Sequence, residues 1–146
     1  MANTNYLKNE VEQYVRDTCL IQRFSNQHFS KQTLQLTTGG KHEFDAVSTD
    51  KSIIVGIKTN SGKTRGGKPP AGKYAELFQE LYFLTLVRAP KKLLVLTNEE
   101  MFKAFLVKSQ GKVPADINIT FCKLPLQIMD KVKSVQSDAS VEQGKK

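Results

Sequence analysis

The chain is poor in the residues that build several common kinds of site. Its 146 residues include two cysteines, two histidines and no tryptophan. Cys19 and Cys122 stand far apart and in no CxxC pattern, which argues against structural zinc and, without a secretory signal, indicates a reducing cytosol. His28 and His42 are too few for a multi-histidine metal centre. Because no apolar run approaches the roughly 18 residues that span a bilayer, we expect a cytoplasmic protein with no membrane segment.

Acidic residues are also scarce relative to basic ones. The chain has 22 lysines and arginines against 14 acids, and its net charge of +8 indicates a polyanionic partner. The excess is concentrated between Lys51 and Tyr74, where there are six cations and no acid. Residues 61–72, SGKTRGGKPPAG, form a loop rich in glycine, proline and cations. A basic run is often only a solvated surface, so the neighbouring segments decide its meaning.

Helical and strand patterns alternate along the chain. The patterns predict helices at residues 6–20, 73–88, 97–107 and 127–132, strands at 33–37, 93–96 and 117–123, and a β-hairpin at 42–60 whose turn is residues 48–51. This order predicts one α/β domain over residues 1–135, with a mixed central sheet flanked by helices. We expect the polar tail, residues 136–146, to be disordered.

The most informative segment is a predicted β-hairpin at residues 42–60, HEFDAVSTDKSIIVGIKTN. With Thr49 and Asp50 at its tip, the hairpin pairs Asp45 with Ile54 and Glu43 with Gly56. Since side chains alternate along a strand, Asp45, Gly56 and Lys58 share one face. The other face is apolar and carries Phe44, Ile53, Val55 and Ile57. The hairpin therefore brings a carboxylate and an ammonium together beside the basic loop.

These residues resemble the motif of the PD-(D/E)XK, or restriction-endonuclease-like, nuclease superfamily. Phe44-Asp45 corresponds to the first part of the motif and Gly56-Ile57-Lys58 to the second, with ten residues between Asp45 and Gly56. The predicted order αβββαβ is also that of the superfamily, so the resemblance covers about residues 6–123. It implies a restriction-endonuclease-like core.

The resemblance implies hydrolysis of DNA phosphodiesters with Mg²⁺, for which Ca²⁺ or Mn²⁺ could substitute in binding. Asp45 would be the principal metal ligand, and Lys58 would orient the attacking water or stabilise the transition state. Members of the superfamily often add a glutamate from the first helix. Glu10 is the expected catalytic and metal-binding acid, because it flanks the apolar stripe while Glu12 points further away.

Gly56 departs from the motif, because its position normally holds a metal-binding Asp or Glu and glycine has no side chain to offer. Three explanations compete. Another acid replaces the missing one, from Glu43 or from Glu76 or Glu80; or a substitution has disarmed the nuclease; or the protein binds DNA without cutting it. The disarmed nuclease is the preferred interpretation, and Gly56→Glu is then expected to raise cleavage.

The expected partners are double-stranded DNA and further copies of the chain. Lys63, Arg65, Lys68 and Lys73 are the candidates for contacts with DNA phosphates. Residues 81–87 are apolar on nearly every side of the long helix, as in a helix covered by a neighbouring subunit or buried deep in the core. Because one such active site cuts one strand, a double-strand break favours a dimer or a tetramer.

The expected function is a site-specific double-strand DNA endonuclease, and the small single domain is similar to the bacterial group I intron-encoded homing endonucleases of this fold. Two alternatives remain open. A Holliday-junction resolvase is also small, basic and oligomeric, and a non-cleaving DNA-binding module would explain Gly56.

Overall fold

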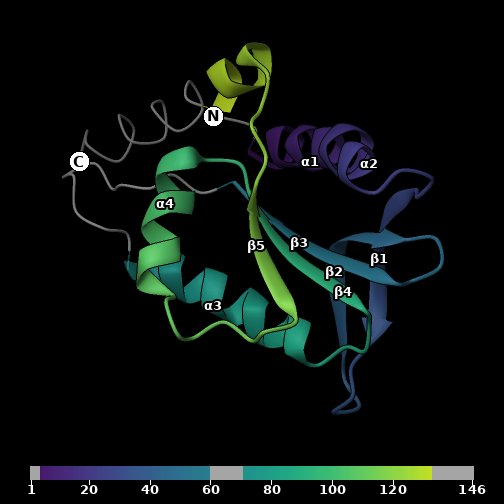
Figure 1. Ribbon diagram of the computed structural model, residues 1–146. Helices are drawn as coiled ribbons and strands as arrows, with labels where there is room; N and C mark the ends of the chain where they lie inside the picture. The colour runs from purple at the N-terminus through teal and green to yellow at the C-terminus, as the bar shows by residue number, and fades with distance from the viewer. Residues whose placement is uncertain (1–3, 60–70, 133–146) are drawn as a thin grey trace.

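A five-stranded mixed sheet is the centre of the computed structural model, which describes residues 4–59 and 71–132 (Figure 1). The strands follow one another in the order β1-β2-β3-β4-β5. Neighbours from β1 to β3 are antiparallel, and β3, β4 and β5 run parallel. The elements are α1 (Thr4–Tyr14), η1 (a π-helix, Val15–Cys19), α2 (Leu20–Arg23), β1 (Phe29–Gln35), β2 (Lys41–Ser48), β3 (Ile53–Lys58), α3 (Ala71–Thr85), β4 (Lys91–Leu96), α4 (Glu99–Lys108) and β5 (Ile117–Phe121). The predicted α/β class with a mixed sheet is confirmed.

Helices cover both faces of the sheet (Figure 1). On one face, Val15 and Leu20 from η1 and α2 pack on Val55 and its neighbours. On the other face, α3 and α4 bury an apolar cluster that includes Leu77 and Phe105. Strands β3 and β4 are therefore buried on both sides, which explains why both read as nearly continuous apolar runs.

A smaller cluster joins the two ends of the described chain. Leu7 and Val11 of α1 pack against Leu124, with Ile128 and Met129 at the edge of the contact. Residues 126–132 are helical, so the predicted short C-terminal helix is confirmed. The tail predicted to be disordered and most of the basic loop, residues 133–146 and 60–70, lie outside the described residues.

The hairpin turn lies one residue later than predicted. Lys51 adopts a left-handed φ of 62°, and its N–H donates to the Ser48 carbonyl at 2.8 Å. Hydrogen bonds from Ser52 and then from the Ser48 hydroxyl and Gln27 hold the pKa of the Asp50 carboxyl well below its usual range. The pairs are therefore Ala46 with Val55 and Val47 with Ile54. The predicted register, with Asp45 opposite Ile54, is wrong by two residues.

A β-bulge in β2 changes the faces of the hairpin residues. Ser30 of β1 pairs with Val47, whereas Gln32 pairs with Phe44, so Asp45 and Ala46 together oppose a single residue. As a result Phe44 and Val47 both lie in the cluster under α3, while Ala46 lies under η1. The predicted position of Phe44, on the same face as Ile53, Val55 and Ile57, is wrong for this reason.

Cys19, at the end of η1, and Cys122, just after β5, form a disulfide, with 6.2 Å between their Cα atoms. The interpretation of the two cysteines as lone thiols is wrong, because only the folded chain brings residues so far apart in sequence together. Disulfides are rare in the cytosol except in hyperthermophiles, so the cytoplasmic location stays a prediction. Within residues 4–59 and 71–132, no helix combines the length and the apolar character of a membrane span.

Candidate active site

The space above Gly56 is filled by a carboxylate. A Cβ atom added to Gly56 would lie 2.6 Å from Cγ and 2.8 Å from Oε1 of Glu80, which comes from α3. Glu80 is 5% exposed. Any larger residue at position 56 would have to displace it, so glycine is what allows the helix to bring its acid against the strand. Glu80, one of the acids that could replace the missing one at this position, therefore lies against Gly56.

The Glu80 carboxylate is hydrogen-bonded to His42, whose ring packs against two phenylalanine rings. His42 Nε2 is hydrogen-bonded to Glu80 Oε2 at 3.0 Å. The His42 ring lies flat against Phe83, with 3.9 Å between centroids and 7° between planes, and meets Phe44 edge-on. Burial raises the pKa of the Glu80 carboxyl above its usual range; the Lys58 ammonium opposes that shift, and the Asp45 carboxylate adds to it.

Lys58 ends strand β3 beside this carboxylate. Ile54 lies in the cluster under α3 and Gly56 faces Glu80, so the alternation along β3 puts Lys58 on the same face. Its side chain is half-buried. The Thr97 N–H donates to the Lys58 carbonyl at 3.1 Å, which fixes the end of β3 to the end of β4.

Asp45 lies in the bulge, where β2 and β3 separate. The paired residues of these two strands are Ala46 with Val55 and Val47 with Ile54. Beyond them, the Ile57 N–H donates to Asp45 Oδ2 at 2.8 Å, so the carboxylate bridges the strands in place of a backbone pair. Asp45 interacts electrostatically with Glu80 of α3 and with Glu12 of α1. It therefore links acids from both faces of the sheet.

Glu12 is the buried acid of the first helix. It is 1% exposed, with Lys31 Nζ 3.1 Å and Arg16 Nη1 3.8 Å from Oε1. The Lys31 ammonium is therefore within hydrogen-bonding distance of this buried carboxylate. Burial raises the pKa of the Glu12 carboxyl, and the charge of Asp45 raises it further. The expectation that Glu12 points away is wrong, because the helical segment has a second buried face toward the sheet.

The other expected acids lie elsewhere. Glu10 pairs with Lys131 of the C-terminal helical segment at 3.1 Å. Glu43 and Glu76 are exposed. Of the expected DNA-contacting cations, Lys73 is half-buried near the start of α3, and Lys63, Arg65 and Lys68 lie outside the described residues. Sequence reasoning named Glu80 among several candidates; its one distinguishing signal is an acid between Leu77 and Leu84 in a buried helical stripe.

The donor chemistry fits a hard cation, although no complete ligand cage is present. Across residues 4–59 and 71–132, no group of three or more histidine, cysteine, aspartate or glutamate side chains stands close enough to hold a metal ion. Mg²⁺ needs only one or two carboxylates, because water and substrate phosphates complete its octahedron. Asp45 and Glu80 could supply these, since the Asp45 charge raises the cost of a charge on Glu80 and a cation relieves it.

Comparisons of the chain with protein-family models, with characterised proteins and with solved structures returned no match.

Proposed function

We propose that this chain is a Mg²⁺-dependent DNA endonuclease of the PD-(D/E)XK type, with its second acid moved from β3 to α3. The observation that carries the proposal is the Glu80 carboxylate over Gly56, in electrostatic interaction with both Asp45 and Lys58. The order of elements supports the proposal, because a helix, an antiparallel three-stranded meander, a helix and a parallel strand follow one another in the αβββαβ order of that superfamily.

Each residue has a role in this mechanism. Asp45 and Glu80 would hold the metal, and the hydrogen bond between His42 Nε2 and Glu80 Oε2 orients that carboxylate. Mg²⁺, when bound, would neutralise charge on the scissile phosphate and lower the pKa of a water ligand. The Lys58 ammonium orients the attacking water and stabilises the negative charge that develops on the phosphate. Glu12 adds a buried negative charge next to Asp45, which favours a cation there.

The proposal extends to double-stranded DNA as substrate and to a homo-oligomer, since each site cuts one strand. Large apolar side chains on α3 and α4 support self-association: Tyr82 is 57% exposed, Leu106 42% and Val107 75%. Exposed apolar side chains of this size are candidates for contacts with a second copy of the chain. A role in intron homing remains a prediction from the resemblance alone.

The test is nicking of supercoiled plasmid in Mg²⁺, with EDTA as the blank. Glu80→Gln removes the charge but keeps the shape, and we expect it to lower the nicking rate about a hundredfold. Asp45→Asn and Lys58→Ala should do the same. Glu43→Gln and Glu99→Gln are matched controls, because both change exposed glutamates; they should leave the rate unchanged. The assignment would be contradicted if Glu43→Gln lost nicking activity while Glu80→Gln kept it in full. It would also be contradicted if the wild-type protein in Mg²⁺ cleaved neither plasmids nor linear duplexes nor four-way junctions.

A further inference from the structure

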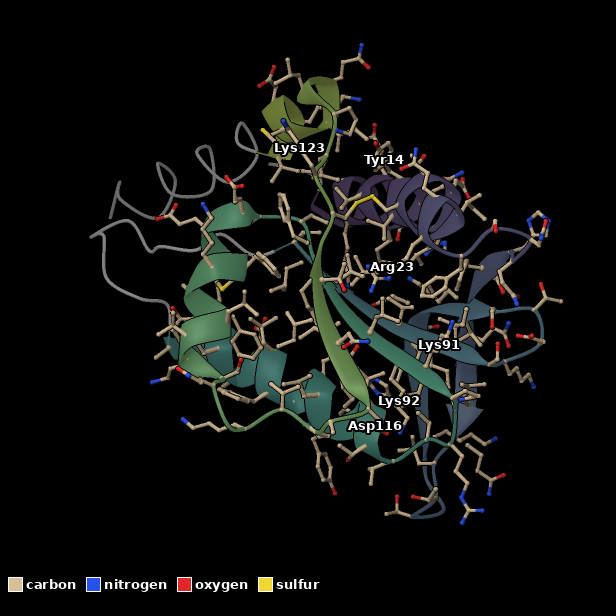
Figure 2. All side chains as sticks on the ribbon, in the orientation of Figure 1. Tyr14, Arg23, Lys91, Lys92, Asp116 and Lys123 are labelled. Carbon is tan, nitrogen blue, oxygen red and sulfur yellow. A yellow bond between two sulfur atoms is a disulfide. The ribbon has the colours of Figure 1, made fainter. Side chains whose placement is uncertain are left out.

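A second candidate binding site lies on the sheet face covered by η1 and α2, opposite Glu80. Two adjoining cavities, of about 330 and about 480 Å³, share Arg23 in their walls. The first is also lined by Phe24, Ser52 and Lys91, and the second by Tyr14, Cys122 and Lys123. Both lie between the helical segment and strands β3 to β5, and we call the two together the α2 groove. Figure 2 shows the labelled side chains of this groove on one side of the molecule.

Among the residues that the structure describes, the cations of the α2 groove have no carboxylate partners. Arg23, Lys91 and Lys123 are exposed, and in the described part of the chain none of the three forms an ion pair. The described residues that line the two cavities include no aspartate or glutamate. The adjacent Lys92 differs: its ammonium lies 3.3 Å from the Asp116 carboxylate (Figure 2). The groove is therefore a site of concentrated positive charge.

Aromatic rings line the same groove. Both Arg23 and Lys91 lie over the ring of Phe24, at 5.7 and 5.1 Å from its centroid. Tyr14 contributes a second, partly buried ring to the neighbouring cavity. Grooves that combine unpaired cations with aromatic faces bind single-stranded nucleic acid, because the cations contact phosphates and the bases stack on the rings. In a duplex, neighbouring base pairs already cover the faces of each base.

We propose that the α2 groove binds a single strand of DNA. Arg23 and Lys91 move from the Phe24 ring to the phosphates, Lys123 contacts a further phosphate, and bases stack on Phe24 and Tyr14. This site is separate from the acidic cluster and needs neither Mg²⁺ nor cleavage. Binding measured in EDTA therefore tests it alone, and its failure leaves the proposed nuclease activity untouched.

The first experiment measures the salt dependence of binding to a fluorescent twelve-nucleotide oligothymidylate by anisotropy. Each lost phosphate contact on a single strand reduces the slope of log K against log salt by about 0.7. Arg23→Gln/Lys91→Gln should therefore make the slope shallower by about 1.4. The control Lys103→Gln/Lys112→Gln removes the same charge from exposed positions in and after α4, and should keep the wild-type slope. The proposal would be overturned if both double variants changed the salt slope equally, or if Arg23→Gln/Lys91→Gln left it unchanged.

The second experiment separates stacking from charge. Phe24→Leu keeps the cations and an apolar side chain, and should weaken oligothymidylate binding at least about fivefold. An abasic oligonucleotide of the same length should bind wild type and Phe24→Leu alike. The preference for a single strand would be refuted if Arg23→Gln/Lys91→Gln reduced the salt slope for a duplex of that length by the same amount as for the oligothymidylate. Unchanged thermal melting of each variant, followed by circular dichroism, shows that the fold is intact.

Discussion

Glu80 and Gly56 share one place in the structure, since the carboxylate on α3 fills the space that the missing side chain on β3 leaves open. Glycine inside a strand weakens it and often marks a close approach by another group. Here the approaching group is a buried acid with Asp45 and Lys58 beside it. Gly56 thus leaves room for Glu80, and under the proposed function it needs no explanation as a disarming substitution.

Gly56→Glu alone should lower nicking, the reverse of what the sequence indicates. The new Cβ would meet Cγ of Glu80 at 2.6 Å, so Glu80 must leave its position and its hydrogen bond to His42. We expect a fall of at least about tenfold in the Mg²⁺-dependent rate. A rise in the rate would revive the disarmed-nuclease interpretation.

The double variant Gly56→Glu/Glu80→Ala should recover part of this activity. It removes the obstructing side chain and supplies a carboxylate from β3 in its place. Nicking by the double variant should exceed that of Glu80→Ala and of Gly56→Glu, each measured at equal protein concentration. If it equals the weaker single variant, the two positions do not serve one function.

Glu12→Gln should stabilise the protein at neutral pH in EDTA. Because the folded pKa of Glu12 is raised above the ordinary 4.5, its contribution to stability is fully present below about pH 4.5 and is lost as the pH rises through the folded pKa. Urea denaturation should show that Glu12→Gln has a higher free energy of unfolding than the wild type at pH 7, and that this difference disappears at pH 4. Glu43→Gln, at an exposed position, should show neither. Destabilisation at pH 7 would mean that the ion pairs with Lys31 and Arg16 outweigh the cost of burial.

Cys19→Ser/Cys122→Ser should lower the free energy of unfolding by about 2–4 kcal/mol, because the disulfide closes a long loop in the unfolded chain. Guanidinium denaturation with and without a reducing agent measures the difference. The reducing agent should destabilise the wild type and leave the double variant unchanged. Equal stability of wild type and double variant under oxidising conditions would contradict this.

Asn98→Ala should destabilise the protein by about 1 kcal/mol. The Asn98 side chain accepts a hydrogen bond from the Met101 N–H at 2.8 Å and caps α4. Thermal melting compares it with Lys103→Ala, a change at an exposed position in the middle of the same helix, which should have little effect. A larger loss in Lys103→Ala would argue against the cap.

Local patterns were enough to predict most elements. The run at β4 is buried as expected, and the helix over residues 73–88 is shifted by only a few residues. These features depend on periodicity and on neighbours within one turn, which a single sequence records.

Features that depend on distant partners were missed. The left-handed backbone at Lys51 moves the hairpin register, although lysine is not a residue that favours it. The bulge at Asp45 forms only against β1. Glu12 is buried because α1 continues into a π-helix that lies on the sheet. None of these contacts is visible from spacing along the chain.

The disulfide has a consequence for chain integrity. Cys19 and Cys122 bracket all five strands, so a single backbone scission at any point between them yields two fragments that remain covalently attached. Such a nicked molecule would migrate as one species on a non-reducing gel and separate into two bands only after reduction.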